Sequence, residues 1–276
     1  MNQILIHQIY VVEFIVKITQ IDRCNVYTCI SGLMPPFQLV VYFYNADGLL
    51  IDAGSANILK EASLILKNET IKMVALTHVH EDHTGMAHWL QKEKNIPIYI
   101  HKNSINEASQ NSNIPLYRRV VWGNRRGFHA QPIPEVLQTE HYTFDVFDAP
   151  GHHPYHIVLH EKNMGWLFTG DLFVSIRQLV AFKDENITDT IVSLQKLLSL
   201  DFDMVFCGHS GVHKNGKEKM KKKLEYFMDI QSKVKALKEK GFSIEEIDKK
   251  LFPKKNLWTI VSGGEWSSRN IVKTVY

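Results

Sequence analysis

One short segment, Thr77 to His83, constrains this chain more than any other feature, because it places three histidines and one aspartate within six residues. An apolar, strand-like run over residues 71–76 precedes it, and a helix-like run over residues 86–91 follows it. A turn from strand to helix is where α/β folds collect their ligands. The sequence therefore predicts a binding or catalytic centre at the end of this strand.

The spacing of these side chains indicates a metal site. On an extended segment the side chains at i and i+2 point the same way, so His78 and His80 can bind one metal ion together. Asp82 and His83 lie past the bend and can face a second ion. Neutral imidazoles with a carboxylate suit zinc best among the common metals. A histidine-rich surface turn is the alternative, and further ligand-type residues downstream disfavour it.

Three such candidates stand at the ends of predicted strands: His152, Asp171 and His209. Each directly follows a glycine, and a glycine lets the backbone pass close to a buried centre. Together with the first segment they make five histidines and two aspartates. That set is sufficient for two zinc ions that share a carboxylate and a water.

Length and composition set the frame for this site. A chain of 276 residues, 45% apolar and 22% charged, can hold one large α/β domain with a small helical addition. A formal net charge of +3 is too small to identify a partner. The three cysteines, Cys24, Cys29 and Cys207, match no zinc motif and indicate a reducing compartment, so the cytoplasm is the expected location. No run has membrane-spanning length, and residues 1–18 are typical of strands rather than of a signal peptide.

The order of the predicted elements divides the chain in two. The histidine segment is preceded by predicted strands over 11–18, 25–30 and 39–44, a hairpin turn over 45–48 and a helix over 55–67. Residues 102–135 show no clear hydrophobic period and are expected to form an irregular lid or binding loop. Strands over 142–148, 156–160, 166–169 and 204–206, with a helix over 188–200, complete the first predicted domain, residues 1–212. The remaining residues, 213–276, are predicted to form a short helical segment. It contains a lysine-rich helix over 214–240, a helix that a capping box of Ser243 and Glu246 opens, and a last helix over 264–275.

The order His-x-His-x-Asp-His, then His, Asp and His, resembles the metallo-β-lactamase-fold hydrolase superfamily, over roughly residues 20–212. Asp52-Ala53-Gly54 also matches the first motif of that superfamily. The resemblance implies an α/β fold, a four-layer αββα sandwich, with the metals at one edge of its two sheets. The C-terminal helices resemble those of a lactamase-like subgroup that includes hydrolases of unassigned substrate and an endoribonuclease, mostly through residues 242–247.

The resemblance also implies a role for each ligand. His78, His80 and His152 would hold the first metal, and Asp82, His83 and His209 the second. Asp171 would bridge the two, and Asp52 would orient a ligand histidine without binding metal. Asp82 would also orient the attacking water and accept its proton.

Departures from the patterns of individual family members narrow the function. Asp171 stands where two-metal β-lactamases have a cysteine or no bridging acid, so antibiotic hydrolysis is disfavoured. His80 argues against flavodiiron enzymes, which have a glutamate there. Residues 172–174 lack the tyrosine of quorum-signal lactonases, and the basic tail lacks the glutathione-binding motif of glyoxalase II. The short interval between Asp171 and His209 leaves no room for the insertion of RNA-cleaving β-CASP members.

The sequence thus predicts a metal-dependent hydrolase that uses two Zn²⁺ ions per chain, with iron or manganese as alternative metals. A metal-bridging hydroxide would attack a small ester, thioester or lactone. Two alternatives stay open: a metal-dependent phosphodiesterase or endoribonuclease, and an oxidoreductase that resembles the mono-iron persulfide dioxygenases. A small-molecule substrate is expected, nucleic acid is not favoured, and a homodimer is a family-level expectation.

Two basic clusters have a functional and a structural interpretation. The first cluster consists of Arg118, Arg119, Trp122, Arg125 and Arg126. It is predicted either to bind substrate or to form a solvated loop with one packed tryptophan, and the two alternatives are weighted equally. For the lysines at 214, 217, 219 and 221–223, the solvent-exposed face of a helix is favoured over a nucleic-acid footprint.

Overall fold

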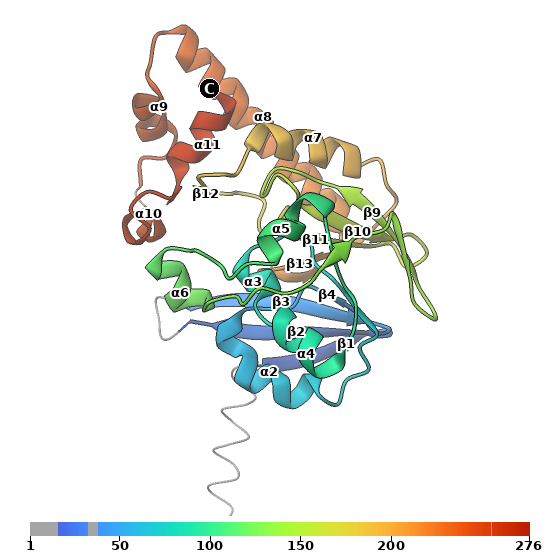
Figure 1. The fold of residues 1–276 in the computed structure, drawn as a ribbon. Helices are drawn as coiled ribbons and strands as arrows, with labels where there is room; N and C mark the ends of the chain where they lie inside the picture. The colour runs from blue at the N-terminus through green and yellow to red at the C-terminus, as the bar shows by residue number, and fades with distance from the viewer. Residues whose placement is uncertain (1–15, 33–37, 255) are drawn as a thin grey trace, which may run out of the picture.

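The computed structural model describes residues 16–32, 38–254 and 256–276, and two β-sheets face each other at its centre (Figure 1). The strands of the first sheet, in spatial order, are β1 (Val16–Ile21), β2 (Cys24–Ser31), β3 (Leu39–Ala46), β4 (Leu49–Ile51), β5 (Met73–Ala75), β6 (Ile98–Ile100) and β7 (Gln131–Pro132). This sheet is antiparallel from β1 to β4 and parallel from β4 to β7.

The strands of the second sheet, in spatial order, are β14 (Gly211–His213), β13 (Met204–Cys207), β11 (Trp166–Gly170), β10 (Ile157–Glu161), β9 (Thr143–Asp148) and β8 (Val136–Gln138). This sheet is antiparallel except where β11 pairs with β13. A small ribbon of β12 (Ala181–Phe182) and β15 (Trp266–Ser267) joins the loop after β11 to the C-terminal segment.

Helices cover the outer face of each sheet (Figure 1). On the first sheet lie η1 (Ala56–Ile58), α2 (Leu59–Leu66) and α4 (Ala87–Lys94), and on the second lie α7 (Ile187–Leu197) and α8 (Gly216–Glu239). The other helices are α3 (Glu81–Thr84), η2 (Lys102–Ser104), α5 (Ile105–Ala108), α6 (Leu116–Trp122), α9 (Ile244–Leu251), α10 (Leu257–Val261) and α11 (Ser268–Val275).

Three apolar clusters correspond to the three interfaces between four layers. One fills the space between the sheets and contains Tyr44, Phe144, Phe168 and Phe206. A second lies between the first sheet and its helices, and a third lies between the second sheet and α7, α8, α9 and α11. Because each sheet buries both faces, the αββα sandwich predicted from the sequence is confirmed.

The tight turn predicted at residues 45–48 joins β3 to β4 as an antiparallel hairpin. Its two central residues, Asp47 and Gly48, both have positive φ, as a two-residue hairpin turn requires. The strand predicted over residues 11–18 is described only from Val16, and its first part lies outside the described residues.

The prediction of an irregular segment over residues 102–135 is wrong in part, since η2, α5 and α6 lie within it. In α6 the buried residues are Arg118, Val121 and Trp122, which lie three and four positions apart as on one helix face. Because the first of these buried positions holds an arginine, the sequence does not show the apolar period of a helix here. Its burial is stabilised by an ion pair with buried Glu81.

The C-terminal segment packs into the core of the second sheet. On α8, Met220, Phe227, Ile230 and Val234 belong to the same cluster as Leu167 of β11. The predicted capping box of α9 is present. Lys223 corrects the prediction of a wholly solvated lysine face, because its side chain is fully buried and its ammonium donates to Gln178. The division at residue 212 stays a prediction.

Two further features bear on the predictions about disulfide bonds and membrane-spanning segments. Cys24, Cys29 and Cys207 are buried free thiols. Across the described residues, no helix combines the length and apolar character needed to cross a bilayer.

We expect Phe227→Ala to destabilise the whole protein, because the ring is fully buried between α8 and the second sheet. Loss of a buried phenylalanine costs about 3–5 kcal/mol of unfolding free energy, measured by urea denaturation. The matched control is Met228→Ala on the same helix, where the side chain is 48% exposed and the expected loss is below about 0.5 kcal/mol. Equal effects of the two substitutions would contradict the packing of α8 into the core.

Candidate metal centre

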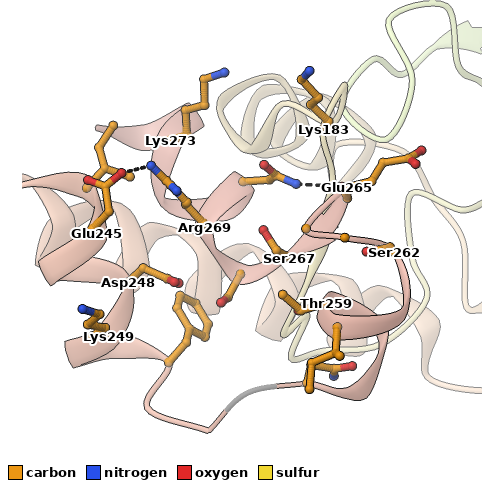
Figure 2. Close-up of a pocket in the computed structure, with 18 of the residues that line it drawn as sticks. Lys183, Glu245, Asp248, Lys249, Thr259, Ser262, Glu265, Ser267, Arg269 and Lys273 are labelled. Atoms are coloured by element: carbon orange, nitrogen blue, oxygen red, sulfur yellow. Dashed lines mark hydrogen bonds and ion pairs between the residues drawn. The ribbon is translucent and has the colours of Figure 1, made fainter.

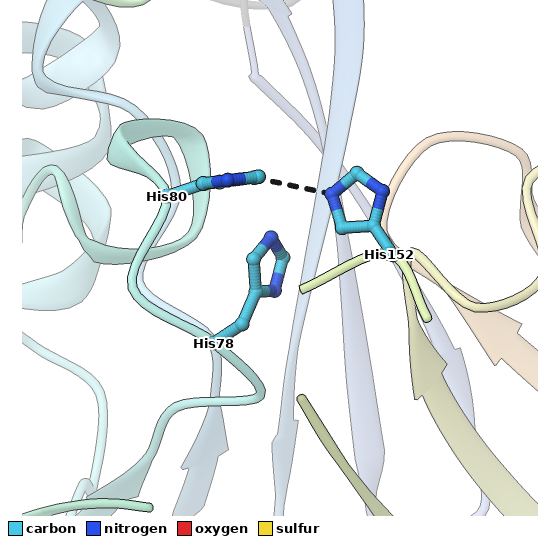
Figure 3. A group of neighbouring side chains, drawn as sticks. All are labelled: His78, His80 and His152. Atoms are coloured by element: carbon cyan, nitrogen blue, oxygen red, sulfur yellow. Dashed lines mark hydrogen bonds between the residues drawn. The ribbon is translucent and has the colours of Figure 1, made fainter. Parts of the chain in front are cut away.

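The first group of ligand candidates consists of three buried histidines, His78, His80 and His152. The first two lie between the end of β5 and the start of α3, and the third follows β9. Figure 3 shows the three rings turned toward one another, with His80 Nδ1 and His152 Nε2 3.1 Å apart. One ligand atom from each ring lies within 4.8 Å of the others. His153 and His156, neighbours in sequence, do not belong to this group.

The second group, next to the first, consists of Asp82, His83, Asp171 and His209. Asp82 and His83 lie in the short helix α3, Asp171 follows β11, and His209 follows β13. The Asp171 carboxylate lies 3.1 Å from His209 Nε2 and 3.3 Å from His83 Nε2. Since it also lies 3.5 Å from His152 Nε2, Asp171 stands between the two groups.

Glycines let these loops approach one another. A Cβ atom on Gly208 would lie 2.5 Å from the ring of His83 and 2.6 Å from the Asp171 carboxylate. At Gly170, where φ is positive, a Cβ would lie 2.6 Å from Thr77 Oγ1. Any larger side chain would therefore push the ligand loops apart, as expected for glycines beside ligand residues.

The donor set fits divalent metal ions. Three of its atoms, His78 Nε2, His83 Nε2 and Asp171 Oδ1, are buried without a hydrogen-bond partner. Orphaned buried polar atoms are rare and costly. Cations held between these atoms would satisfy all three, and imidazole with carboxylate is a donor set that zinc and related metals prefer.

Asp52 holds the other side of the second group. Its carboxylate lies 2.7 Å from Nδ1 of His83 and accepts hydrogen bonds from the amide and hydroxyl of Thr77. Thr77 Oγ1 in turn lies 3.1 Å from Nδ1 of His78. These contacts leave Nε2 of both histidines facing the centre, as outer partners of metal-binding histidines do.

Two more histidines are fixed in the same way. His209 Nδ1 lies 2.7 Å from the carbonyl oxygen of Val40. Because a carbonyl oxygen can only accept, Nδ1 is the donor, and Nε2 is left to face the centre. His152 Nδ1 faces the buried carboxylate of Glu185 at 3.5 Å. Sequence reasoning missed Glu185, because it lies in a segment without a motif and reaches His152 only through the fold.

Glu185 itself is held by a chain of polar side chains. Its carboxylate accepts from the amide of Gln178 at 2.7 Å and from the backbone N–H of Phe182 at 2.8 Å. Gln178 accepts from Lys223, the buried lysine of α8. This chain ties the C-terminal helix to a ligand histidine, and burial lowers the pKa of Lys223 to about 8.

The histidines of the site differ in charge. Burial opposes the charged form of His152 in the first group, but Glu185 and Asp171 raise its pKa. Burial lowers the pKa of His80 to about 3 and that of His78 well below its ordinary value, so both rings are neutral. Burial also opposes the charged form of His83 and His209, but the neighbouring carboxylates, Asp171 foremost, raise both pKa values well above the ordinary range. Without metal, protons on these rings neutralise the carboxylates, and divalent cations would take their place.

Both groups open into one cavity of about 500 Å³. Arg118 and Trp122, which are substrate-binding candidates from the sequence, line it. Arg125 and Arg126 are not among its lining residues, and Arg125 instead lines an adjoining cavity that His80 and Arg118 also border. The guanidinium of Arg125 donates to the backbone carbonyls of residues 107, 108 and 110 and so holds the loop before α6.

Arg118 is not a free cation in this cavity. Glu81 pairs with its guanidinium through two hydrogen bonds, and Glu265 of the C-terminal segment lies 3.6 Å away. Phe182 lies beneath the guanidinium, packs against His80 and His152, and stacks on Trp266 at 4.9 Å. Both aromatic rings line the cavity, and no motif in the sequence marks either of them.

Comparison with known proteins agrees with this geometry. The family model described as the metallo-beta-lactamase superfamily matches residues 34–209, which is more than half of the chain. The chain belongs to that superfamily. The resemblance stated from the motifs is therefore confirmed.

Two relatives of this chain have names that describe hydrolases. The chain is 31% identical over 163 residues to the probable metallo-hydrolase YybB of Bacillus subtilis, an alignment that covers 56% of this chain and 71% of the relative. It is 30% identical over 164 residues to the hydroxyacylglutathione hydrolase GloC of Haemophilus influenzae, where the alignment covers 54% and 73%.

Among solved structures, a metallo-beta-lactamase family protein from Thermus thermophilus aligns with a TM-score of 0.64 at 17% identity. The alignment covers 91% of this chain and 90% of the other. At this identity the likeness supports the fold alone.

We expect Asp52→Asn to lower the metal affinity of the second group about 10–100-fold, because the charge that orients His83 is lost. Asparagine is the suitable replacement, since Asp52 has a φ of 61° and asparagine tolerates that conformation. Competition with a chromophoric chelator measures the affinity. Asp203→Asn, an exposed aspartate away from the site, is the control, and unchanged affinity in Asp52→Asn would contradict the orienting role.

Proposed function

We propose that this protein is a dinuclear metal-dependent hydrolase that cleaves small esters or thioesters with an apolar acyl group. The observation that carries the proposal is that two ligand groups adjoin Asp171 at one wall of a cavity whose other walls are mainly apolar. Superfamily membership supports the coarser statement that the chain is a metal-dependent hydrolase.

The cavity suits a small molecule. Its volume of about 500 Å³ lies in the range of ligand pockets that enclose a small substrate. Away from the ligand candidates, apolar side chains outnumber polar ones in its lining: Leu39, Val40, Trp122, Val174, Leu179, Val180, Phe182 and Trp266. An acyl chain would bury apolar surface against these side chains, which stabilises binding by roughly 25 cal/mol per Å².

The chemistry at the polar wall fits acyl transfer to water. Bound metal ions would supply an activated water and polarise the substrate carbonyl. His78, His80 and His152 would hold one ion, Asp82, His83 and His209 the other, and Asp171 would bridge them.

Asp82 would have a second role besides holding a metal ion. Asp82 lines the cavity and lies 3.0 Å from His209 Nε2, so its carboxylate can orient the attacking water and accept its proton. Burial opposes its charged form, but His83 and His209 lower the pKa of Asp82, so the carboxylate stays ionised.

The charge of Arg118 bears on substrate class. Because Glu81 neutralises it, this arginine offers little attraction to a polyanionic phosphodiester. The name of the relative GloC, a hydroxyacylglutathione hydrolase, supports thioester cleavage as the chemistry.

Elemental analysis joined to a substrate panel tests the proposal. We expect about two zinc ions per chain and turnover of esters and thioesters that rises with acyl chain length, with loss of turnover after chelation. The panel includes lactones and a bis-phosphodiester. Turnover confined to the phosphodiester would favour a nuclease instead, and a single iron would favour oxidation chemistry; either result would overturn the proposal.

A substitution at the shared carboxylate gives an independent test. We expect Asp171→Ala to lower metal content and to reduce ester or thioester turnover by at least about 100-fold, because both ligand groups lose their common acid. Asp203→Ala, at an exposed position, is the control. Full metal loading with retained turnover in Asp171→Ala would contradict the proposed bridging role of Asp171.

A further inference from the structure

A second and larger cavity, of about 1180 Å³, lies within the C-terminal segment (Figure 2). Residues of α9, α10 and α11 line it, together with Lys183, which follows β12. None of its lining residues is a ligand candidate of the metal centre. The proposed hydrolysis therefore leaves this cavity without a role.

Unpartnered polar groups gather at one place in this cavity, the start of α11. Ser267, the residue before this helix, is 5% exposed, and among the described residues its hydroxyl has no hydrogen-bond partner. It does not cap the helix, so the amides of the first turn, residues 268–270, lack both an intrahelical acceptor and a side-chain cap. Figure 2 shows Ser267 among the other lining residues of this cavity.

The charge of the lining favours an anion. Five basic and three acidic side chains line the cavity: Lys183, Lys249, Lys254, Arg269 and Lys273 against Glu245, Asp248 and Glu265. Two of the acids have cationic partners, since Glu245 pairs with Arg269 and Glu265 lies near Arg118, whereas Asp248 has a buried carboxylate oxygen without a hydrogen-bond partner. In the part of the chain that the structure describes, the four lysines have no ion-pair partner, so their charge is available to a ligand.

We propose that this cavity binds a phosphate group, carried on a small organic molecule, at the start of α11. Free helix amides, the Ser267 hydroxyl and the lysines of the same lining together form a set of donors that recognises phosphate. The ligand would accept from Ser267 and from the first-turn amides, while Lys183 and Lys273 balance its charge. A volume of about 1180 Å³ is far larger than a phosphate ion, which argues for a molecule that carries one.

The site shares a wall with the metal centre. In the β12–β15 ribbon, Phe182 and Trp266 line the metal cavity, whereas Lys183 and Ser267 line the C-terminal cavity. Adjacent residues of a strand point to opposite faces, so the ribbon exposes one face to each cavity. A ligand that contacts Lys183 and Ser267 would therefore fix the ring pair that borders His80 and His152.

Calorimetric titration of the metal-loaded, full-length protein with ADP and with inorganic phosphate tests the site. We expect saturable binding of both. The double variant Lys183→Gln/Lys273→Gln should bind at least about tenfold more weakly, because two of the balancing charges are lost. The double variant Lys92→Gln/Lys162→Gln, with the same charge change at exposed positions, should bind as the unmodified protein does. Chemical-shift changes at the amides of residues 267–270 would localise the ligand.

The two probes also distinguish the source of the phosphate. Tighter binding of ADP supports a phosphorylated organic molecule, and equal binding overturns that part of the proposal in favour of free phosphate. Absence of saturable binding, or equal affinity in the two double variants, would overturn the site altogether.

The effect on the metal centre is measured separately. We expect ADP to change the KM for an ester substrate at least about twofold in the control variant and not in Lys183→Gln/Lys273→Gln, because binding couples to the shared wall. This effect rests on the proposed hydrolysis, whereas binding does not. Binding with no ester or thioester turnover would therefore overturn the proposed function and leave the site intact. Binding with turnover but an unchanged KM would contradict the shared wall.

Discussion

The carboxylate of Asp171 is the group on which the rest of the site depends. It lies within 3.5 Å of ring nitrogens from His83, His152 and His209, which come from three different segments of the chain. Burial opposes the ionised carboxylate, but the neighbouring histidines lower the pKa of Asp171 well below its ordinary value. A fixed negative charge between two histidine groups would favour cations in this buried place.

Around this charge, the ligand histidines are held by residues that are not themselves ligand candidates. Asp52 on the first sheet orients His83, and Glu185 beside the second sheet faces His152. The ligands therefore come from both sheets, and the site exists only when the two sheets meet. This arrangement explains why the metal centre lies at an edge of the sandwich and not within either half.

The fold and the convergence of the seven ligand candidates could be predicted, because both depend on local spacing and on a sequence order that the motifs preserve. His78 and His80 lie two residues apart on an extended segment, so their common direction follows from backbone geometry alone. Glu185 and Trp266 could not be predicted, since they reach the site through tertiary contacts between distant segments. Arg118 is a candidate from the sequence, but only the structure pairs it with Glu81 and so changes its charge.

The same distinction applies to the C-terminal segment, which composition alone presents as a lysine-rich helical addition. Its longest helix places Phe227 in the core and buries Lys223 at the end of a polar chain that leads through Gln178 to Glu185. Its short strand adds Trp266 to the wall of the metal cavity. Removing this segment would expose the second sheet and open the cavity, so sequence changes far from the metal ligands can alter the choice of substrate.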